Sequence, residues 1–453
     1  MIFRRIRKKL GKPKLFLAEA VHQAPTAMIR THAAPLSLLV GAALFGGLPV
    51  AGPAPAAAQE GLAAAVEADA AYTADLVANA RGGVERGVVG LGNLDLTARV
   101  DLEELAGLPG TSLFVYVLAN HGEEPSAYVG DAQTLSNIEA PSAVRLYEAW
   151  VEKDFRGPRL SVLFGLYDLN SEFDVLESAA LFVNSSFGIG AEFAASCLNG
   201  PSIFPVTSLG LRALWRPAPS LYLQGAVLDG VAGDPARPGE TAIRLSAREG
   251  ALLAGEVGWI LRRDGGDDGG PGHRTHGPVG RRASPDGIRA KVALGLWDYT
   301  RESTSLDPDA GGRRVESRPG AYLLGEWKAT DGADDPSRGL TLSARVGVAD
   351  PRTNRFVSYT GAAAVYRGLI PGRPGDEIGV GVAAAHNGDP FLEARRSEGR
   401  PTARTETALE LTYRIQGERW ALQPDLQWVV NPGTDPTLES ALAAAVRAEL
   451  RFF

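Results

Sequence analysis

Segments of roughly ten residues, in which apolar and polar side chains alternate, recur along this chain. Residues 94–100, 288–294, 340–346 and 444–452 each place an apolar side chain at every second position. Successive side chains of a β-strand point to opposite faces, so each segment would have one apolar and one polar face. Strands of soluble proteins are usually about five or six residues long, whereas a tilted strand needs about ten to cross a bilayer. The pattern therefore constrains the chain to a fold of long strands.

About sixteen such segments can be recognised. Residues 72–79 are rich in alanine and would also suit a helix, but a closed barrel favours an even number of strands, which supports a strand there. The predicted strands lie near residues 70–79, 92–101, 111–120, 144–155, 159–168, 207–216, 219–228, 241–261, 286–298, 320–330, 338–349, 356–366, 376–386, 405–415, 419–430 and 441–453.

Closure into a barrel follows from what lipid permits. Beyond residue 58, no apolar run approaches the roughly 18 residues that a membrane helix needs. Only helices and closed barrels satisfy their backbone hydrogen bonds in lipid. An arginine facing the bilayer centre costs about 2–4 kcal/mol, so the charged face must line water. We expect an all-β fold, a transmembrane antiparallel β-barrel of about sixteen strands.

The connections differ in length. Tight turns near residues 216–219 and 416–418 contrast with long polar connections at 120–141, 168–206, 262–286 and 299–320. Short periplasmic turns on one rim and long extracellular loops on the other are typical of outer-membrane barrels. The Gly-rich residues 263–285 are expected to form an exposed loop tip.

Aromatic residues gather near the ends of the predicted strands, as in the interfacial girdles of membrane barrels. We expect such a girdle from Trp150, Phe155, Tyr167, Trp215, Tyr222, Trp297, Tyr299, Trp327, Tyr359, Trp420 and Trp428.

The N-terminal residues are typical of a secretory signal peptide. Residues 1–58 carry eight of the 46 basic residues and one of the 53 acidic ones, and an apolar stretch at 36–50 precedes small residues ending at Ala58. We expect cleavage after Ala58, with Met28 as an alternative start. The predicted domains are residues 1–58 as signal peptide and 59–453 as a single outer-membrane barrel.

Charge and composition exclude several functions. Without residues 1–58 the net charge is near −14, which argues against nucleic acid as a partner. His273 and His276 have metal-like spacing but lie in a Gly-rich stretch, and the chain has no G-x-S-x-G motif. The single cysteine, Cys197, cannot form an internal disulfide. We expect no catalytic residues, no metal and no cofactor, and hence not an enzyme.

Several long sequence motifs resemble those of a known family. They include Gly165-Leu-Tyr-Asp-Leu-Asn-Ser-Glu-Phe-Asp174, Leu181-Phe-Val-Asn-Ser-Ser-Phe-Gly-Ile-Gly190 and Asn199-Gly-Pro-Ser-Ile-Phe-Pro205, with further motifs at 91–97, 130–141, 145–150, 227–230 and 423–427. Over roughly residues 70–453 the chain resembles the carbohydrate-selective porins (OprB-like) of Gram-negative outer membranes. The resemblance implies passive diffusion of sugars, above all of the glucose type, through a sixteen-stranded barrel.

The resemblance also implies partners and a location. The implied partners are sugars as permeants, outer-membrane lipid and the outer-membrane assembly machinery. The chain departs from the family in two places: the connection at 263–285 is long and Gly-rich, and the terminal Phe453 falls on the lumen parity of the last strand. A homo-oligomer and a monomer both stay open.

A sugar-selective pore needs groups that hydrogen-bond hydroxyls and an aromatic surface for the ring, with binding weak enough for release. Residues 168–205 are long enough to fold inward and narrow the lumen. The expected pore-lining residues are Arg99, Glu148, Trp150 and Arg212 from the wall and Asn170, Asp174 and Asn184 from that segment. The alternative for each is an ordinary lumen residue in a wall salt bridge.

A second class of function stays open at this stage. A soluble exported β-rich protein, either a carbohydrate-binding protein or a hydrolase, would also have strands with one polar face. Extraction discriminates the two, since a porin needs detergent and a soluble protein is released by osmotic shock.

Overall fold

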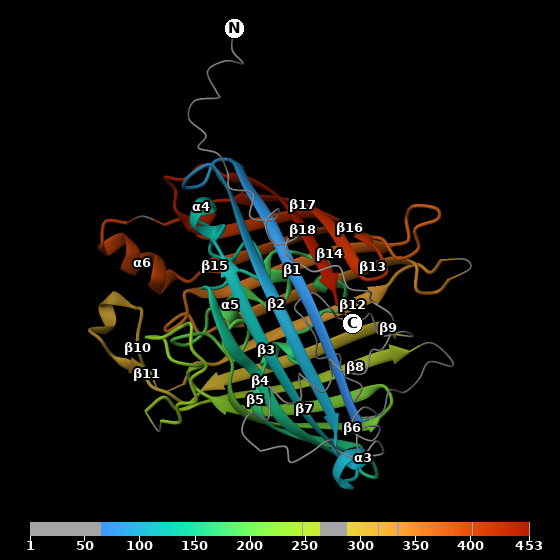
Figure 1. Ribbon diagram of the computed structural model, residues 1–453. Helices are drawn as coiled ribbons and strands as arrows, with labels where there is room; N and C mark the ends of the chain where they lie inside the picture. The colour runs from blue at the N-terminus through green and yellow to red at the C-terminus, as the bar shows by residue number, and fades with distance from the viewer. Residues whose placement is uncertain are drawn as a thin grey trace, which may run out of the picture. The chain divides into compact units, whose positions relative to one another are not determined.

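Sixteen antiparallel strands form a closed barrel in the computed structural model of the chain (Figure 1). The structure describes residues 65–246, 248–262, 288–315, 317–332, 335–400 and 402–452. The predicted signal peptide at 1–58, the loop tip at 263–285 with its two histidines, and Phe453 lie outside these residues. The predicted barrel is confirmed.

Each barrel strand pairs with the next one along the chain, and β1 pairs with β18 to close the ring. A separate two-stranded hairpin, β10 (Ser303–Thr304) with β11 (Arg314–Val315), lies in the connection between β9 and β12. The barrel strands are β1 (Val66–Arg81), β2 (Gly87–Asp101), β3 (Thr111–Gly122), β4 (Ala143–Phe155), β5 (Leu160–Tyr167), β6 (Ser208–Ala218), β7 (Leu221–Asp229), β8 (Ala251–Arg262), β9 (Ile288–Tyr299), β12 (Gly320–Lys328), β13 (Gly339–Ala349), β14 (Phe356–Arg367), β15 (Glu377–Asn387), β16 (Thr405–Gln416), β17 (Trp420–Val430) and β18 (Ala441–Arg451).

The seam between the first and last strands illustrates how alternation builds the wall. On β18, Val446 and Leu450 point outward and are about half exposed, while Arg447 is buried inside. Arg447 lies opposite Asp75 in the β1–β18 register, and the two form an ion pair with Nε and Oδ1 2.8 Å apart. The outer face is therefore apolar and the inner face charged, as the alternation predicts.

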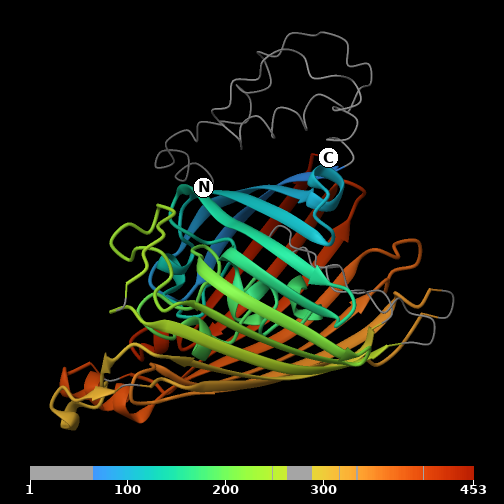
Figure 2. The ribbon, with the colours of Figure 1, turned by 90° about the horizontal axis from the view of Figure 1, so that it is seen from below.

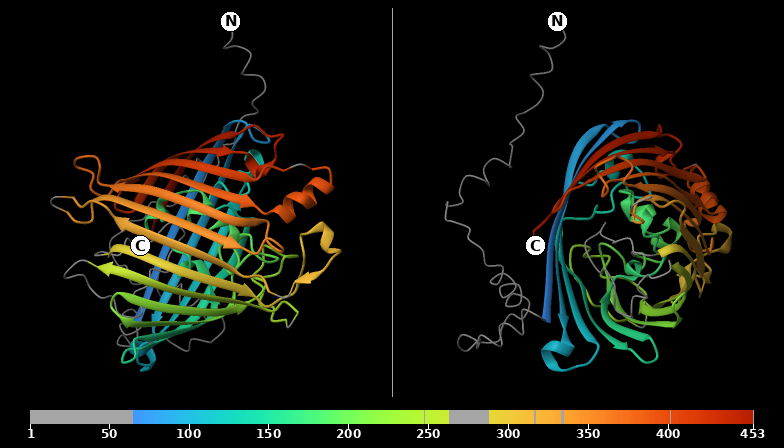
Figure 3. Two further views of the ribbon diagram at one scale, coloured as in Figure 1. Left: turned by 180° about the vertical axis from the view of Figure 1, so that it is seen from behind. Right: turned by 90° about the vertical axis from the view of Figure 1, so that its right-hand side faces the viewer.

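Long and short connections separate onto two rims (Figure 3). One rim carries short turns such as 156–159, 219–220 and 417–419, together with both ends of the barrel chain. The opposite rim carries the long connections, among them 123–142 and 168–207. Arg262 of β8 and Ile288 of β9 both lie on the short-turn rim, because strand direction alternates around the barrel. Grouping residues 262–286 with the long-loop rim was therefore wrong.

The predicted aromatic girdle is only partly present. Of the predicted residues, Phe155, Trp215, Trp327 and Trp420 are exposed on the outer wall near the short-turn rim, and Trp428 is exposed near the other rim. Trp259, which was not predicted, is also exposed near the short-turn rim. The prediction was wrong for six buried residues, which face inward and pack inside the barrel: Trp150, Tyr167, Tyr222, Trp297, Tyr299 and Tyr359.

Residues 168–207, between β5 and β6, fold back inside the ring of strands (green in Figure 3, right). We call them the inward segment. It contains four short helices: η2 (Leu169–Ser171), η3 (Ser178–Leu181), η4 (Ser185–Phe187) and α5 (Ala191–Ala194). Four of its five aromatic side chains, those of Phe173, Phe182, Phe187 and Phe193, are buried, and Phe193 stacks on Trp297 at 4.1 Å between ring centroids. Inward-facing wall aromatics are thus the packing surface for this segment.

The remaining helices are short and lie in the connections: α3 (Leu102–Ala106), α4 (Ser126–Val129), η5 (Pro308–Ala310), α6 (Asp389–Ser397) and η6 (Pro432–Thr434). Within the described ranges, no helix has the length and apolar character that crossing a membrane requires.

Candidate functional site

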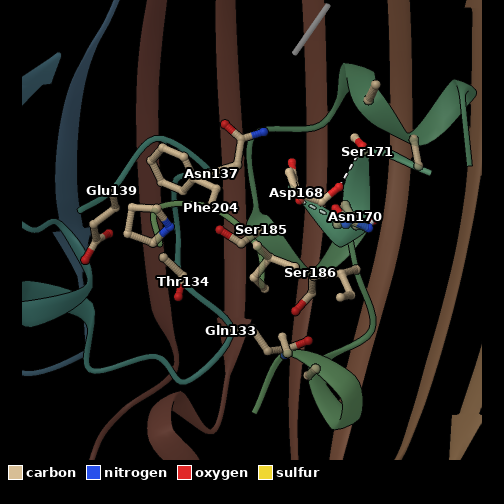
Figure 4. A pocket seen from close by; sticks show the side chains of 18 of the residues that line it. Gln133, Thr134, Asn137, Glu139, Asp168, Asn170, Ser171, Ser185, Ser186 and Phe204 are labelled. Atoms are coloured by element: carbon tan, nitrogen blue, oxygen red, sulfur yellow. Dashed lines mark hydrogen bonds between the residues drawn. The ribbon is translucent and has the colours of Figure 1, made fainter. Parts of the chain in front are cut away.

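A cavity of about 370 Å³ lies inside the barrel between the wall at β3 and β4, the connection after α4, and the inward segment (Figure 4). In Figure 2 the inward segment is the green chain that lies within the ring of strands. Figure 4 shows side chains of the inward segment and of residues 133–139 around one space, with Phe204 among them. The polar and aromatic lining comprises Tyr116, Gln133, Thr134, Asn137, Glu139, Tyr147, Glu148, Asp168, Asn170, Ser171, Phe182, Ser185, Ser186 and Phe204.

A β-bulge in β4 shapes the wall of this cavity. Tyr116 of β3 pairs with Glu148, whereas the next residue, Val117, pairs with Leu146, so Tyr147 is the extra residue. As a result the side chains of both Tyr147 and Glu148 are buried inside the barrel. Bulges re-aim side chains in this way near functional sites. Strict alternation would have placed Tyr147 outward, and sequence periodicity alone therefore missed it.

Glu148 links the wall to the start of the inward segment. Its Oε2 accepts hydrogen bonds from Trp150 Nε1–H at 3.0 Å and from the backbone N–H of Asp168 at 3.3 Å. The side chain of Asp168 in turn accepts the backbone N–H of Asn170 at 2.9 Å and caps η2. These contacts fix the carboxylates of Glu148 and Asp168 at the cavity wall.

Asn170 lines the cavity and holds two arms of the inward segment together. Its Nδ2 donates to the carbonyl oxygens of Phe173 at 3.0 Å and Gly188 at 3.2 Å. Removing the amide would therefore loosen the segment as well as change the lining.

Arg99 and Trp150 lie beside the cavity lining and not in it. The guanidinium of Arg99 sits 5.4 Å from the centroid of the Trp150 ring, which stacks on Phe114 at 5.0 Å. Trp150 is only 1% exposed. With so little of its surface exposed, its ring offers no open face to the cavity, and another aromatic must supply one.

Arg212 lies in a buried ion network that joins β6, the wall and the inward segment. Its Nη2 lies 2.7 Å from Glu152 Oε1, and its Nε lies 2.9 Å from Glu172 Oε2. Arg212 also donates to the carbonyl oxygen of Ser161 at 3.0 Å. This places the arginine outside the cavity lining.

Asp174 and Asn184 anchor the inward segment farther along. Asp174 Oδ1 lies 2.7 Å from Nε of Arg345 on β13. Asn184 donates its side-chain amide to Oε1 of Gln427 on β17 at 3.1 Å. Of the seven predicted residues, Glu148 and Asn170 line the cavity and the other five hold the surrounding structure; contact of any of them with sugar stays a prediction.

Wall glutamates on three strands accept backbone N–H groups of the inward segment, a feature that sequence reasoning missed. Glu256 of β8 accepts from Asp174 at 3.2 Å, and Glu326 of β12 accepts from Ser178 at 3.0 Å. Glu410 of β16 accepts from Val183 at 2.6 Å. Hydrogen bonds to a carboxylate are roughly twice as strong as neutral ones. Inward acids on the strands therefore position the segment that forms the cavity.

Burial changes the acidity of two carboxyl groups in the connections. Glu139 accepts from the Ser126 hydroxyl at 2.8 Å, and its burial raises its pKa to about 7. Burial, assisted by the nearby charge of Asp174, raises the pKa of Glu192 in α5 to about 8. In the part of the chain that the structure describes, no three His, Cys, Asp or Glu side chains are arranged to hold a metal ion.

Comparison with known proteins places the chain among porins. The sequence pattern of the carbohydrate-selective porin, OprB family, matches residues 85–452. Porin B of Pseudomonas aeruginosa is 24% identical over 414 residues, covering 84% of this chain and 86% of the relative. The high-pH structure of Pseudomonas putida OprB superposes with a TM-score of 0.73 at 20% identity, over 87% of this chain and 96% of that one. The low-pH structure of the same protein gives a TM-score of 0.53 at 17% identity, over 87% and 94%.

Proposed function

The chain belongs to the OprB family of carbohydrate-selective porins and is a sugar porin of the Gram-negative outer membrane; from this membership we propose that it conducts monosaccharides of the glucose type by passive diffusion. The observation that carries the proposal is the cavity of about 370 Å³ between the β3–β4 wall and the inward segment. We propose that permeating sugars pass through this cavity.

The cavity lining has the chemistry that a hexose requires. A hexose presents hydroxyl groups around its edge and an apolar face on its ring, so it needs hydrogen-bonding groups and an aromatic side chain. Glu148, Asn170 and Ser185 provide the first, and Phe204 provides an aromatic ring at the cavity. Binding by a few such groups in water is weak enough for release, as conduction demands.

The inward segment accounts for a preference for small sugars. It occupies lumen space beside β4 and is held by carboxylates on β8, β12 and β16. Anchoring on several sides of the wall keeps the passage narrow, so a disaccharide should pass far more slowly than glucose. In this account Arg99, Trp150, Arg212, Asp174 and Asn184 maintain the geometry, while Glu148 and Asn170 are the groups that contact sugar.

We also propose that the protein has no catalytic activity and that its partners are permeant sugars, outer-membrane lipid and the assembly machinery. A soluble exported hydrolase or carbohydrate-binding protein is disfavoured by the outer surface. Large apolar side chains such as Phe164, Leu296 and Val380 are each more than half exposed on the barrel wall. Such a surface suits lipid and would aggregate in water.

The proposal is tested by current block in planar lipid bilayers. Glucose should reduce the single-channel conductance of the purified protein in a saturable manner, and Glu148→Gln should weaken the block about tenfold, the loss expected for one hydrogen bond to a charged group. Glu418→Gln, at an exposed position in the turn between β16 and β17, is the matched control, and glucose should block its conductance as it does that of the wild type. Absence of any block by glucose in the wild type would contradict a sugar site in the channel.

A further inference from the structure

The connection between β7 and β8 reaches back along the long-loop rim to β4. We call its residues 230–246 the strap. It begins directly after β7, yet Oγ1 of Thr241 donates to the backbone carbonyl of Leu146 on β4 at 3.0 Å. β5 and β6 lie between β4 and β7 in the ring of strands. The strap therefore spans the part of the rim where the inward segment leaves β5 and returns to β6.

The strap is also bound to the inward segment. Nδ2 of Asn199 donates to the carbonyl oxygen of Ala232 at 2.7 Å. At Gly233, a Cβ would lie only 2.4 Å from Cγ1 of Val206, so the two chains are in close contact. Asn199 and Val206 flank residues 203–205, which line the cavity. The strap thus joins two stretches of chain that border the cavity, the β4 wall and the end of the inward segment.

A buried wall arginine holds the strap at its β4 end. Arg145 is 2% exposed, and its Nε and Nη2 donate to the carbonyl oxygen of Pro238 in the strap at 3.1 and 2.8 Å. Nη2 also donates to the carbonyl oxygen of Pro141 at 3.1 Å, and Nη1 donates to Oδ1 of Asn120 at 2.9 Å. One guanidinium therefore ties the strap to β3 and to the connection before β4. Arg145 lies two residues before Tyr147, the bulge residue of the cavity wall.

The partners of Arg145 differ from those of three other buried arginines of the wall. Arg212, Arg345 and Arg447 each pair with a buried acid. Within the described part of the chain, Arg145 donates to neutral oxygens alone. Its contacts therefore depend on the planar arrangement of guanidinium N–H groups, which a lysine ammonium cannot reproduce.

We propose that Arg145 is a positioning residue, which holds the strap across the long-loop entrance of the cavity and so limits how fast sugar enters from that side. This inference rests on the proposed function and deepens it. A barrier at one entrance slows binding and release through that entrance equally, so it leaves the equilibrium affinity of the cavity unchanged. Sugar that enters from the short-turn side does not cross the strap.

The test measures glucose-induced current noise of the purified full-length protein in planar bilayers, with glucose added to one side at a time. Arg145→Lys keeps the charge but loses the planar donor set. Its rate constant for glucose association should rise about threefold or more from one side and stay unchanged from the other, because the strap limits only one entrance. The dissociation constant, measured with equal glucose on both sides, should match that of the wild type.

The matched control is Arg156→Met. Arg156 lies in a short turn, its side chain is 77% exposed, and it pairs with Glu103. Such surface pairs contribute about 0–1 kcal/mol. Glucose should associate with this variant at the wild-type rate from both sides.

A reversible crosslink separates release of the strap from damage to the cavity. A Cβ at Gly239 of the strap would lie 3.5 Å from Cβ of Ala143 on β4, within the range for a disulfide. In an Arg145→Lys/Cys197→Ser background, Gly239→Cys with Ala143→Cys should restore the rate of the Cys197→Ser protein when oxidised and lose it again on reduction.

Four results would overturn the inference while glucose still blocks the wild-type channel. They are a wild-type association rate in Arg145→Lys, altered association from both sides, a changed dissociation constant, and an oxidised crosslink that restores nothing. Absence of glucose block in the wild type would instead contradict the proposed function.

Discussion

Arg345 and Asp174 form a buried ion pair that ties the inward segment to β13. Nε of Arg345 lies 2.7 Å from Oδ1 of Asp174, and the side chains are 2% and 0% exposed. The same guanidinium donates to the carbonyl oxygens of Asp174 at 2.6 Å and Gly188 at 3.2 Å. One wall arginine thus holds two parts of the segment that are distant along the chain, which makes it a central anchor of the cavity.

Removing Arg345 should release the inward segment. Arg345→Met leaves Asp174 buried without its cation, which costs about 3–5 kcal/mol. We expect a wider passage, with higher single-channel conductance and measurable disaccharide flux. The double variant Arg345→Met/Asp174→Asn should recover part of the wild-type behaviour.

The control for this prediction is Arg352→Met. Arg352 pairs with Asp350 in an exposed connection, with a side chain 58% exposed, and such surface pairs contribute about 0–1 kcal/mol. Wild-type conductance is expected for the control. Unchanged conductance in Arg345→Met would show that the segment is held by other contacts.

Gly347 on β13 gives a steric test of how α5 packs on the wall. A Cβ at this position would overlap Oε1 of Glu192, which is fully buried. Gly347→Ala should displace α5 and speed hydrogen exchange of residues 185–196, measured by mass spectrometry. At Gly255 on β8 the nearest atom to an added Cβ is 4.0 Å away, so Gly255→Ala should exchange like the wild type. Identical exchange in both variants would contradict the packing of α5.

Glu192 should also make the stability of the inward segment depend on pH. Burial raises its pKa to about 8, whereas an unfolded glutamate titrates near about 4.3. Between these values the folded state keeps a proton that the unfolded state has lost, so stability falls as pH rises, by at most about 1.4 kcal/mol per pH unit. Below about 4.3 the group has no effect, and above 8 the loss is complete.

Glu192→Gln tests the predicted fall in stability with rising pH directly, because the amide does not titrate. The variant should exchange hydrogen in residues 185–196 more slowly than the wild type at pH 8.5 and at the same rate near pH 4. A wild type that becomes more protected as pH rises, relative to the variant, would contradict the buried protonated carboxyl.

The Arg212→Ala variant distinguishes a direct role of Arg212 in sugar contact from a structural role. Arg212 pairs with Glu152 and Glu172 outside the cavity lining. Arg212→Ala should therefore destabilise the barrel and lower the temperature at which its mobility in SDS gels shifts. Glucose should still block the channels that remain folded. Removing the cation from beside two buried acids costs about 3–5 kcal/mol. Unchanged thermal behaviour with lost glucose block would instead support sugar contact by the arginine.

The barrel was predictable because its information is local and periodic. Lipid outside and water inside impose a two-residue period, and each of the sixteen predicted segments overlaps one barrel strand. The predicted strand boundaries were least accurate where polar loop residues keep an alternating pattern, as at 241–250, which precede β8. The hairpin of β10 and β11 is too short to leave such a pattern.

The cavity was less predictable because its contacts join residues distant in the sequence. The bulge at Tyr147 shifts one strand against another and leaves no sign in alternation. Glu256 and Glu410 look like ordinary lumen acids, yet they accept backbone N–H groups from the inward segment. Trp297 was predicted to be interfacial because it lies near the end of a strand. Its position along the strand does not tell whether its side chain faces the lipid or the lumen, and it is buried inside.

Liposome swelling with sugars of graded size tests the central claim most directly. Proteoliposomes that contain the purified protein should swell quickly in glucose and far more slowly in a disaccharide, while liposomes without protein should swell in neither. The Arg345→Met variant should narrow the difference between the two sugars. Swelling of the wild type at equal rates in both sugars, or no swelling in glucose, would contradict a sugar porin narrowed by its inward segment.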